Sequence, residues 1–454
     1  MTFRVISGGR ASGPRQGLLI ENAAEVVTLA GGIRMGPRQG DLAHLEAAGM
    51  GGLDSADAPL VACWESRIVA VGARGEVMAA LEAARLPLDR FERIDARGGS
   101  VTPGLIDPHT HLLFGGSREG ELLLRQRGAK YLEILQAGGG ILSTVAATRG
   151  ASDGELMAHG RRWLAEMLTH GVTTVEAKSG YGLDLPTELR LLELSFQLGR
   201  EGPVDVVPTY LGAHAVPAEF RARPDGTEAY VRSIIEEQLP GVAAQGRARF
   251  CDVFCEEGVF SADQSQRILA AAAAFGMTPR LHADELAPSG GAELAAEIGA
   301  ASADHLAAPS EAGIDALARA AADGRPVVAT LLPATTWFLM SERYAPAREL
   351  IDRGVPVALA TDFNPGTSPT SNILVVLTAA CLELKLTPAE ALVAVTVNAA
   401  HALGLGEELG SLEPGKQADL VVWRVPTVAQ LPYWVGADLV ATVVKRGRVV
   451  LGNA

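Results

Sequence analysis

The feature that most constrains the fold is an alternation of short β-branched runs with longer Ala- and Leu-rich stretches over residues 101–404. This alternation is typical of βα units, which build a parallel sheet. Eight β-branched runs end at the segments GLIDPHTH, GVTTVEAKS, VDVVPTYLGAH, RFCDVFCE, MTPRLHADE, ASADHL, PVVATLL and VPVALATDF. Eight βα units predict an α/β fold with a closed, TIM-like (β/α)8 barrel.

The two ends of the chain have a different character. Residues 1–100 and 405–454 contain short β-rich runs such as GLLIENAAEVVTL and VATVVKRGRVV, broken by Gly, Pro and Asp turns. We expect both segments to form one smaller β-sandwich-like domain beside the barrel. Within the first segment, residues 1–16 are expected to be a mobile tail and the Gly-rich residues 34–58 a long surface excursion.

Composition and charge exclude several classes of partner. The formal charge of -14 argues against nucleic acid and against an anionic membrane surface. Four scattered cysteines are too few for a disulfide framework, and Cys251 and Cys255 are expected to be small buried strand residues. The sequence has no signal-peptide-like run and no apolar stretch of about 18 residues. These features predict a soluble, cytoplasmic protein.

Polar side chains collect where the predicted strands end. In a (β/α)8 barrel the active site forms at the carboxyl ends of the strands, so polar residues there carry functional weight. His109 and His111 lie two residues apart after the first strand, so both imidazoles can point to the same face. The other polar residues at strand ends are Glu176, Lys178, His214, His282, Glu285, His305 and Asp362.

Four of these residues form a donor set for a metal. The imidazoles of His109, His111 and His282 with the carboxylate of Asp362 suit one Zn²⁺ or Fe²⁺ ion per chain, which lowers the pKa of bound water towards neutrality. We expect Glu285 to shuttle the proton, His305 to stabilise developing charge and Asp362 to take part in catalysis as well. The alternatives are hydrogen-bonded core histidines and, for Glu285, a solvated carboxylate at a helix N-terminus.

Longer motifs around these residues resemble the amidohydrolase superfamily and, within it, the imidazolonepropionase family. The motifs are DPHTHLLFGGSRE, YLEILQAGGGI, VTTVEAKSGYGL, LGAHAVP, FCDVFCEEGVF, LHADEL and LATDFNPGTSP, and the resemblance covers about residues 100–420. It implies hydrolysis of the ring amide of 4-imidazolone-5-propanoate to N-formimidoyl-L-glutamate. It also implies a homodimer, which is usual in that family.

The resemblance implies a role for each matching residue. His109, His111, His282 and Asp362 would bind the metal. Arg118 would pair with the propanoate, for which a guanidinium fork is suited. The ring and the reacting amide would contact Tyr181, His214 and Glu285, and the glutamate-like end would contact Asn364, Gly366 and Thr367. The alternatives are that Arg118 is a surface charge and that the NPGTS segment is only a turn.

Three questions stay open at this level. Some superfamily members carboxylate a lysine that bridges two metals, but Lys178 is expected to pair with an acid such as Glu176 beside a single metal. A deaminase of a nucleobase-like ring would share the site and have no evident use for Arg118 or the NPGTS segment. A metal-free scaffold or binding protein would have lost ligands, and all four are present.

Overall fold

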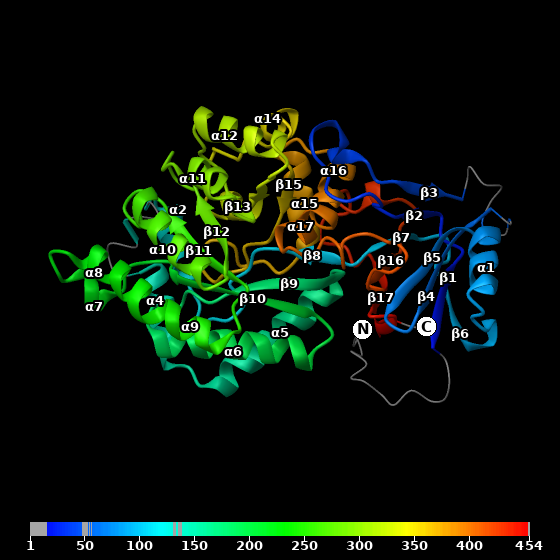
Figure 1. The fold of residues 1–454 in the computed structure, drawn as a ribbon, viewed down its shortest axis with the longest axis horizontal. Coiled ribbons are helices and arrows are strands. Elements are labelled where there is room, and N and C mark those ends of the chain that lie inside the picture. The colour runs from blue at the N-terminus through cyan, green and yellow to red at the C-terminus, as the bar shows by residue number, and fades with distance from the viewer. Residues whose placement is uncertain are drawn as a thin grey trace.

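The computed structural model describes residues 16–47, 53, 55, 57–129, 133–134 and 139–452. Residues 1–15 of the predicted mobile tail and part of the YLEILQAGGGI motif lie outside the described residues. The described chain forms a barrel and a sheet domain side by side. In Figure 1 the green and yellow barrel elements occupy one end of the molecule, and the blue strands lie with red β17 at the other.

The barrel is a sheet of eight parallel strands with the order β15-β14-β13-β12-β11-β10-β9-β8. Each of the eight predicted runs contains one of these strands. Strand β9 is buried along its whole length, as expected for a parallel strand covered on both faces. The strands are β8 Leu105–Asp107, β9 Val172–Lys178, β10 Asp205–Ala213, β11 Phe250–Cys255, β12 Thr278–Ala283, β13 Ser302–His305, β14 Val328–Leu331 and β15 Val357–Leu359.

The first and last barrel strands meet at a seam that carries predicted site residues. The N–H of Asp362 donates to the carbonyl of His109 at 3.0 Å, and the N–H of His111 donates to the carbonyl of Phe363 at 2.9 Å. Below them, the buried Asp107 carboxylate accepts from the N–H and the hydroxyl of Thr361 at 3.1 and 2.5 Å. The barrel therefore closes through the backbone of candidate metal ligands.

Helices follow the strands and cover the barrel. Their first turns are fixed by local chemistry: Ser152, Asp184, Ser261 and Ser310 each accept a hydrogen bond from a first-turn N–H group. These helices are α2 Glu119–Gln126, α4 Ile141–Gly150, α5 Asp153–Thr169, α6 Leu185–Glu201, α7 Ala218–Arg221, α8 Gly226–Ser233, α9 Leu239–Gln245, α10 Ala262–Ala274, α11 Gly291–Ile298, α12 Glu311–Ala322, α13 Pro333–Phe338, α14 Ala347–Asp352, α15 Ile373–Leu382, α16 Pro388–Ala394 and α17 Val397–Ala402. None of the helices in the described ranges has the length and apolarity needed to cross a bilayer.

The smaller domain contains two sheets built from both ends of the chain. Strand β16 pairs antiparallel with β7, and the indole N–H of Trp423 donates to the Thr102 hydroxyl at 2.9 Å. One sheet has the order β5-β4-β1-β6 and the other β18-β17-β16-β7-β2-β3, so the predicted fold class is confirmed. The members are β1 Gly17–Glu21, β2 Glu25–Val27, β3 His44–Glu46, β4 Pro59–Trp64, β5 Arg67–Ala73, β6 Phe91–Asp95, β7 Ser100–Pro103, β16 Leu420–Trp423, β17 Val440–Lys445 and β18 Arg448–Leu451, with helix α1 Arg74–Ala83.

The prediction of a surface excursion over residues 34–58 is wrong for its first part. The side chains of Arg34 and Gln39 are fully buried, and β3 pairs with β2. Gln39 donates to the carbonyl of Val357 in barrel strand β15 at 2.9 Å. The segment has little hydrophobic periodicity because polar side chains, rather than an apolar face, attach it to the barrel.

Asn398 on α17 ties this segment to the barrel and should be important for stability. Its Oδ1 accepts from the Arg34 N–H, and its Nδ2 donates to the carbonyls of Arg34 and Val357, all at 2.9 Å. Because each buried polar group left without a partner costs about 1–3 kcal/mol, Asn398→Ala should lower the free energy of unfolding by about 3 kcal/mol. Urea unfolding checks this, with Gln197→Ala as control because the one side-chain bond of Gln197 is exposed. Equal unfolding curves for the two variants would contradict the assignment.

Candidate metal centre and active site

A cavity lies among the residues at the carboxyl ends of the barrel strands. Ten of the twelve predicted site residues line it, and Ile141 and Phe254 complete the wall. His109 and Gly366 do not line the cavity, but each contacts residues that do. The lining residues are His111, Arg118, Ile141, Tyr181, His214, Phe254, His282, Glu285, His305, Asp362, Asn364 and Thr367.

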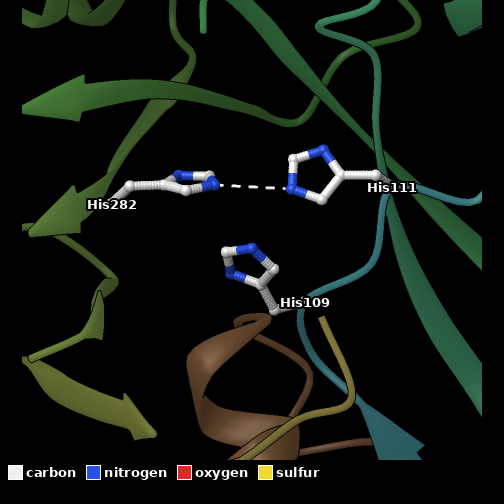
Figure 2. Close-up of side chains that lie close together, drawn as sticks. All are labelled: His109, His111 and His282. Carbon is white, nitrogen blue, oxygen red and sulfur yellow. Dashed lines mark hydrogen bonds between the residues drawn. The ribbon is translucent and has the colours of Figure 1, made fainter. Parts of the chain in front are cut away.

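Three imidazole rings converge beneath the cavity. Figure 2 shows His109 and His111 on one chain segment facing His282 from β12. One ring nitrogen of each lies within 4.8 Å of the others, and the Nε2 atoms of His111 and His282 are 3.5 Å apart. Asp362 Oδ1 lies beside two of these rings, at 3.5 Å from His109 Nε2 and 3.4 Å from His111 Nε2. Three imidazoles thus converge, with a carboxylate next to two of them.

The hydrogen bonds of two rings fix which nitrogen carries a lone pair. His109 Nδ1 lies 2.6 Å from Asp304 Oδ2, and His282 Nδ1 lies 3.1 Å from Asp252 Oδ1. Because an ionised carboxylate only accepts, each Nδ1 carries the hydrogen and each Nε2 presents its lone pair. His109 Nε2 and Asp362 Oδ1 are buried without a hydrogen-bond partner among the described residues. Orphaned buried acceptors at this point fit a bound cation.

The protonation states also suit a cation. Burial lowers the pKa of His109 to about 3 and that of His111 to about 4, so both rings are neutral near pH 7. Burial alone would raise the pKa of Asp362, but the adjacent imidazoles of His109 and His111 hold it well below its usual range. The site therefore offers neutral imidazoles and an ionised carboxylate, which are ligands for Zn²⁺ or Fe²⁺.

The orientation of the Asp362 carboxylate is set by a neighbour that sequence reasoning missed. The hydroxyl of Thr335, on α13, donates to Asp362 Oδ2 at 2.7 Å, so Oδ1 is the oxygen directed at the rings. The backbone at Asp362 has φ 51°, and that at His305 has φ 75°. Both values lie in the left-handed region, which non-glycine residues adopt at a cost and often at functional sites.

Glu285 and His305 lie together beside the candidate metal ligands. Glu285 Oε2 is 3.7 Å from His305 Nε2, and both side chains are largely buried. Burial raises the pKa of Glu285 to about 7, although His305 opposes the shift. A carboxyl group that titrates near neutrality can both accept a proton and return it, which is what proton transfer in hydrolysis requires.

Arg118 lies buried in the cavity wall and is held by an acid. Its Nε and Nη2 donate to the two carboxylate oxygens of Glu121 at 3.0 and 2.8 Å, which fixes the plane of the guanidinium. A Cβ at Gly366 would overlap this guanidinium, so a larger residue there would displace the Arg118 side chain. Arg118 is thus not a surface charge. Glu121 holds one edge of the guanidinium, and Arg118 lines the cavity, where the cation can attract an anion.

The NPGTS segment forms a turn that also lies at the cavity. Asn364 Oδ1 accepts from the N–H groups of Gly366 and Thr367 at 2.8 and 2.7 Å, as in an Asx turn. Arg125 on α2 donates to the carbonyl of Gly366 at 2.8 Å. The turn and Arg118 therefore form one side of the cavity together.

Aromatic rings form the remaining wall. The His214 ring is stacked on that of His111, with ring centroids 4.8 Å apart. The ring centroids of Tyr181 and His214 are 5.3 Å apart. His214 Nδ1 donates to the carbonyl of Gly180 at 2.9 Å, and burial lowers the pKa of His214 well below its usual range, so the ring is neutral. Phe254, which was not predicted from the sequence, also lines the cavity, and its ring centroid lies 5.6 Å from that of His282. This wall can accept a flat ring.

Lys178 is paired with acids below the metal ligands. Its Nζ lies 2.8 Å from Glu176 Oε1 and 2.6 Å from Asp252 Oδ2. Burial alone would lower the pKa of Lys178, but Asp252 and Glu176 raise it. A lysine held as a cation in this way is not set up to be carboxylated, which argues against a bridged pair of metals.

Three neighbours of the ligands were missed from the sequence, namely Asp252, Arg280 and Asp304. A usable signal existed, because a charged residue inside a strand that is buried on both faces needs a partner. Arg280 lies two residues before His282 on the same strand, and Asp304 directly precedes His305. A second set with ligand-like spacing, Glu25, His44 and Glu46, lies in the sheet domain with His44 and Glu46 exposed.

Fold and site define a metal-dependent hydrolase of the amidohydrolase class, which acts on C–N bonds. The Amidohydrolase family model matches residues 256–450. An adenosine deaminase from Xanthomonas campestris with bound zinc has a TM-score of 0.65 and 22% identity, covering 96% of this chain and 93% of that one. An atrazine chlorohydrolase from Arthrobacter aurescens, complexed with zinc, has a TM-score of 0.62 and 19% identity, covering 96% and 95%. These two structures show the shared fold.

Sequence relatives narrow the class. The imidazolonepropionase of Geobacillus kaustophilus is 50% identical over 436 residues, which are 96% of this chain and 98% of that protein. The imidazolonepropionase of Shouchella clausii is 51% identical over 362 residues, 80% of this chain and 79% of that protein. The chain belongs to the imidazolonepropionase family.

Loss of one candidate ligand should remove the metal. His282→Ala takes away one of three converging imidazoles, so we expect metal content after dialysis to fall to about a tenth of wild type or less. Metal per chain is measured by atomic emission. His44→Ala is the matched control, since His44 belongs to the exposed second set. Full metal content in the His282 variant would remove His282 from the ligand set.

Proposed function

We propose that this protein hydrolyses the ring amide of 4-imidazolone-5-propanoate to N-formimidoyl-L-glutamate. The observation that carries the proposal is that one cavity contains both a converging three-histidine centre and a buried, oriented arginine. A substrate with a hydrolysable ring at one end and a carboxylate at the other matches these two parts. Membership of the imidazolonepropionase family supports the same substrate.

We propose that His109, His111, His282 and Asp362 hold one Zn²⁺ or Fe²⁺ ion per subunit. When bound, the ion supplies Lewis acidity and lowers the pKa of water towards neutrality. The orphaned Nε2 of His109 and Oδ1 of Asp362 support this set.

Glu285 moves the proton in the proposed reaction. It takes a proton as water adds to the ring carbonyl carbon, and it delivers a proton to the ring nitrogen as the C–N bond breaks. A pKa near 7 suits both steps, because the group can hold a proton and release it at neutral pH. His305, 3.7 Å from Glu285, stabilises charge that develops on the carbonyl oxygen.

The remaining cavity residues position the substrate. The guanidinium of Arg118 binds the propanoate, and Tyr181 and His214 contact the ring. In the product, the glutamate-like end lies against Asn364, Gly366 and Thr367. A nucleobase deaminase, the second candidate, would bind a neutral ring and leave the Arg118 subsite without a function.

Two further properties belong to this proposal. We propose a homodimer, supported by the exposed apolar side chains of Tyr433, Trp434 and Val435, which are 70%, 50% and 65% exposed in one loop. A cytoplasmic location stays a prediction from the sequence.

The deciding experiment is an assay on freshly generated 4-imidazolone-5-propanoate. Loss of the ring's ultraviolet absorbance is followed with metal-loaded protein and with a chelated sample, and the product is identified by mass. Chelator-sensitive formation of formimidoylglutamate is expected. Metal-loaded protein that leaves this compound intact but releases ammonia from a nucleobase would favour the deaminase.

Replacing Arg118 should mainly weaken substrate binding. A charge-assisted hydrogen bond contributes about 1.5–3 kcal/mol, so Arg118→Ala should raise KM about 10- to 100-fold with a smaller change in kcat. Steady-state kinetics test this, with Arg161→Ala as control because Arg161 pairs with Glu201 on the surface. An unchanged KM would exclude Arg118 as the carboxylate-binding residue.

Replacing Glu285 should slow the chemistry without removing the metal. Glu285→Gln keeps the shape of the side chain and abolishes proton transfer, so kcat should fall by about 10² or more. Metal content measured on the same preparation should equal that of wild type. Near-normal turnover would exclude Glu285 from the mechanism.

A further inference from the structure

Below the three imidazole rings lies a cluster of charged side chains that the reaction itself does not use. We call it the ion cluster, and each of its side chains is 0–1% exposed. The members come from strands β9, β11, β12 and β13, which belong to one continuous part of the barrel sheet. The ion cluster consists of Glu176, Lys178, Asp252, Arg280 and Asp304.

The two cations hold the carboxylates. The Nζ atom of Lys178 lies 2.8 Å from Glu176 Oε1, 2.6 Å from Asp252 Oδ2 and 3.6 Å from Asp304 Oδ2. Arg280 Nη2 donates to Asp304 Oδ2 at 3.1 Å and to the carbonyl of Pro108 at 2.8 Å. Each carboxylate of the cluster therefore faces a cation.

Two of these carboxylates also hold metal-ligand rings. Asp252 Oδ2 accepts from Lys178, while its Oδ1 lies 3.1 Å from both the Nδ1 and the backbone N–H of His282. Asp304 Oδ2 accepts from Arg280 and from His109 Nδ1. Two chains of contacts result, from Lys178 through Asp252 to His282 and from Arg280 through Asp304 to His109.

The charges of the ion cluster hold its carboxylates in place. Three carboxylates and two cations leave the ion cluster with one net negative charge beneath a centre suited to a divalent cation. A buried carboxylate without its cation is strongly disfavoured and changes its contacts. If Lys178 were lost, Asp252 would no longer be held in the position from which it orients His282.

We propose that Lys178 and Arg280 are positioning residues of the metal centre, which fix Asp252 and Asp304 so that the Nε2 atoms of His282 and His109 point at one ion. This inference rests on the metal-binding part of the proposed function. Partners of ligating histidines alter metal affinity about 10- to 100-fold in other proteins. The same range is expected here.

The chain offers a matched control. Lys445 is also buried, and its Nζ lies 2.7 Å from Asp205 and 2.6 Å from Asp419. It donates to the carbonyl of Thr173 at the amino end of β9, and its partners are not candidate metal ligands. Lys445→Met therefore removes an equivalent buried ion pair away from the site.

The experiment compares Zn²⁺ affinity in Lys178→Met and Lys445→Met by competition with a chromophoric chelator. Both variants should unfold at a lower temperature than wild type. Zn²⁺ affinity should fall about 10- to 100-fold in Lys178→Met and by less than about twofold in Lys445→Met. Equal affinities in the two variants would overturn the proposal, and no substrate is needed, so the result is independent of the reaction assay.

Two further variants separate positioning from general damage. Lys178→Met combined with Asp252→Asn removes one charge of each sign and keeps an acceptor for His282 Nδ1, so Zn²⁺ affinity should recover at least threefold over Lys178→Met alone. If Lys178→Met yields no folded chain, Arg280→Lys replaces it, because it keeps the charge but shortens the reach to Asp304. Zn²⁺ affinity about tenfold weaker in Arg280→Lys is then expected, and wild-type affinity would overturn the proposal.

Discussion

The site depends on the compensation of charge that is buried inside the barrel. Isolated ions are costly to bury, and they are tolerated where each has a partner of opposite sign and good hydrogen bonds. Here the charged residues also follow one another along single strands. On β12, Arg280 lies two residues before His282, and on β9, Glu176 lies two residues before Lys178. Alternate residues of one strand face the same side, so the ions and the metal ligands form successive layers.

A barrel of this kind is shared with deaminases and chlorohydrolases, so the fold does not determine the substrate. In this chain, one side of the cavity is formed by Arg118, just before α2, and by the turn after Asp362. Arg118 precedes α2 and its guanidinium fills the space that a Cβ at Gly366 would need, while Arg125 on α2 donates to the carbonyl of Gly366. The proposed carboxylate subsite and the turn are therefore adjacent, and a change in either would alter the other.

The eight strands and the two-sheet domain were predictable because β-branched runs and their spacing are local properties of the sequence. His109 and His111 were predictable for the same reason. The docking of Arg34 and Gln39 was not, since polar side chains that bind barrel backbone groups leave no periodic pattern. Thr335 and Asp304 were also missed: His109 and Asp304 lie 195 residues apart, so their contact depends on strand register. The roles of the individual site residues stay predictions.

The seam between β8 and β15 has a consequence for the order of assembly. Asp107 and Thr361, which close it, are 254 residues apart in the sequence. Contacts of such long range form late, because the intervening chain must first be ordered. A ribosome-bound chain contains His109 and His111 long before Asp362 is synthesised, so the proposed donor set can come together only after the barrel has closed.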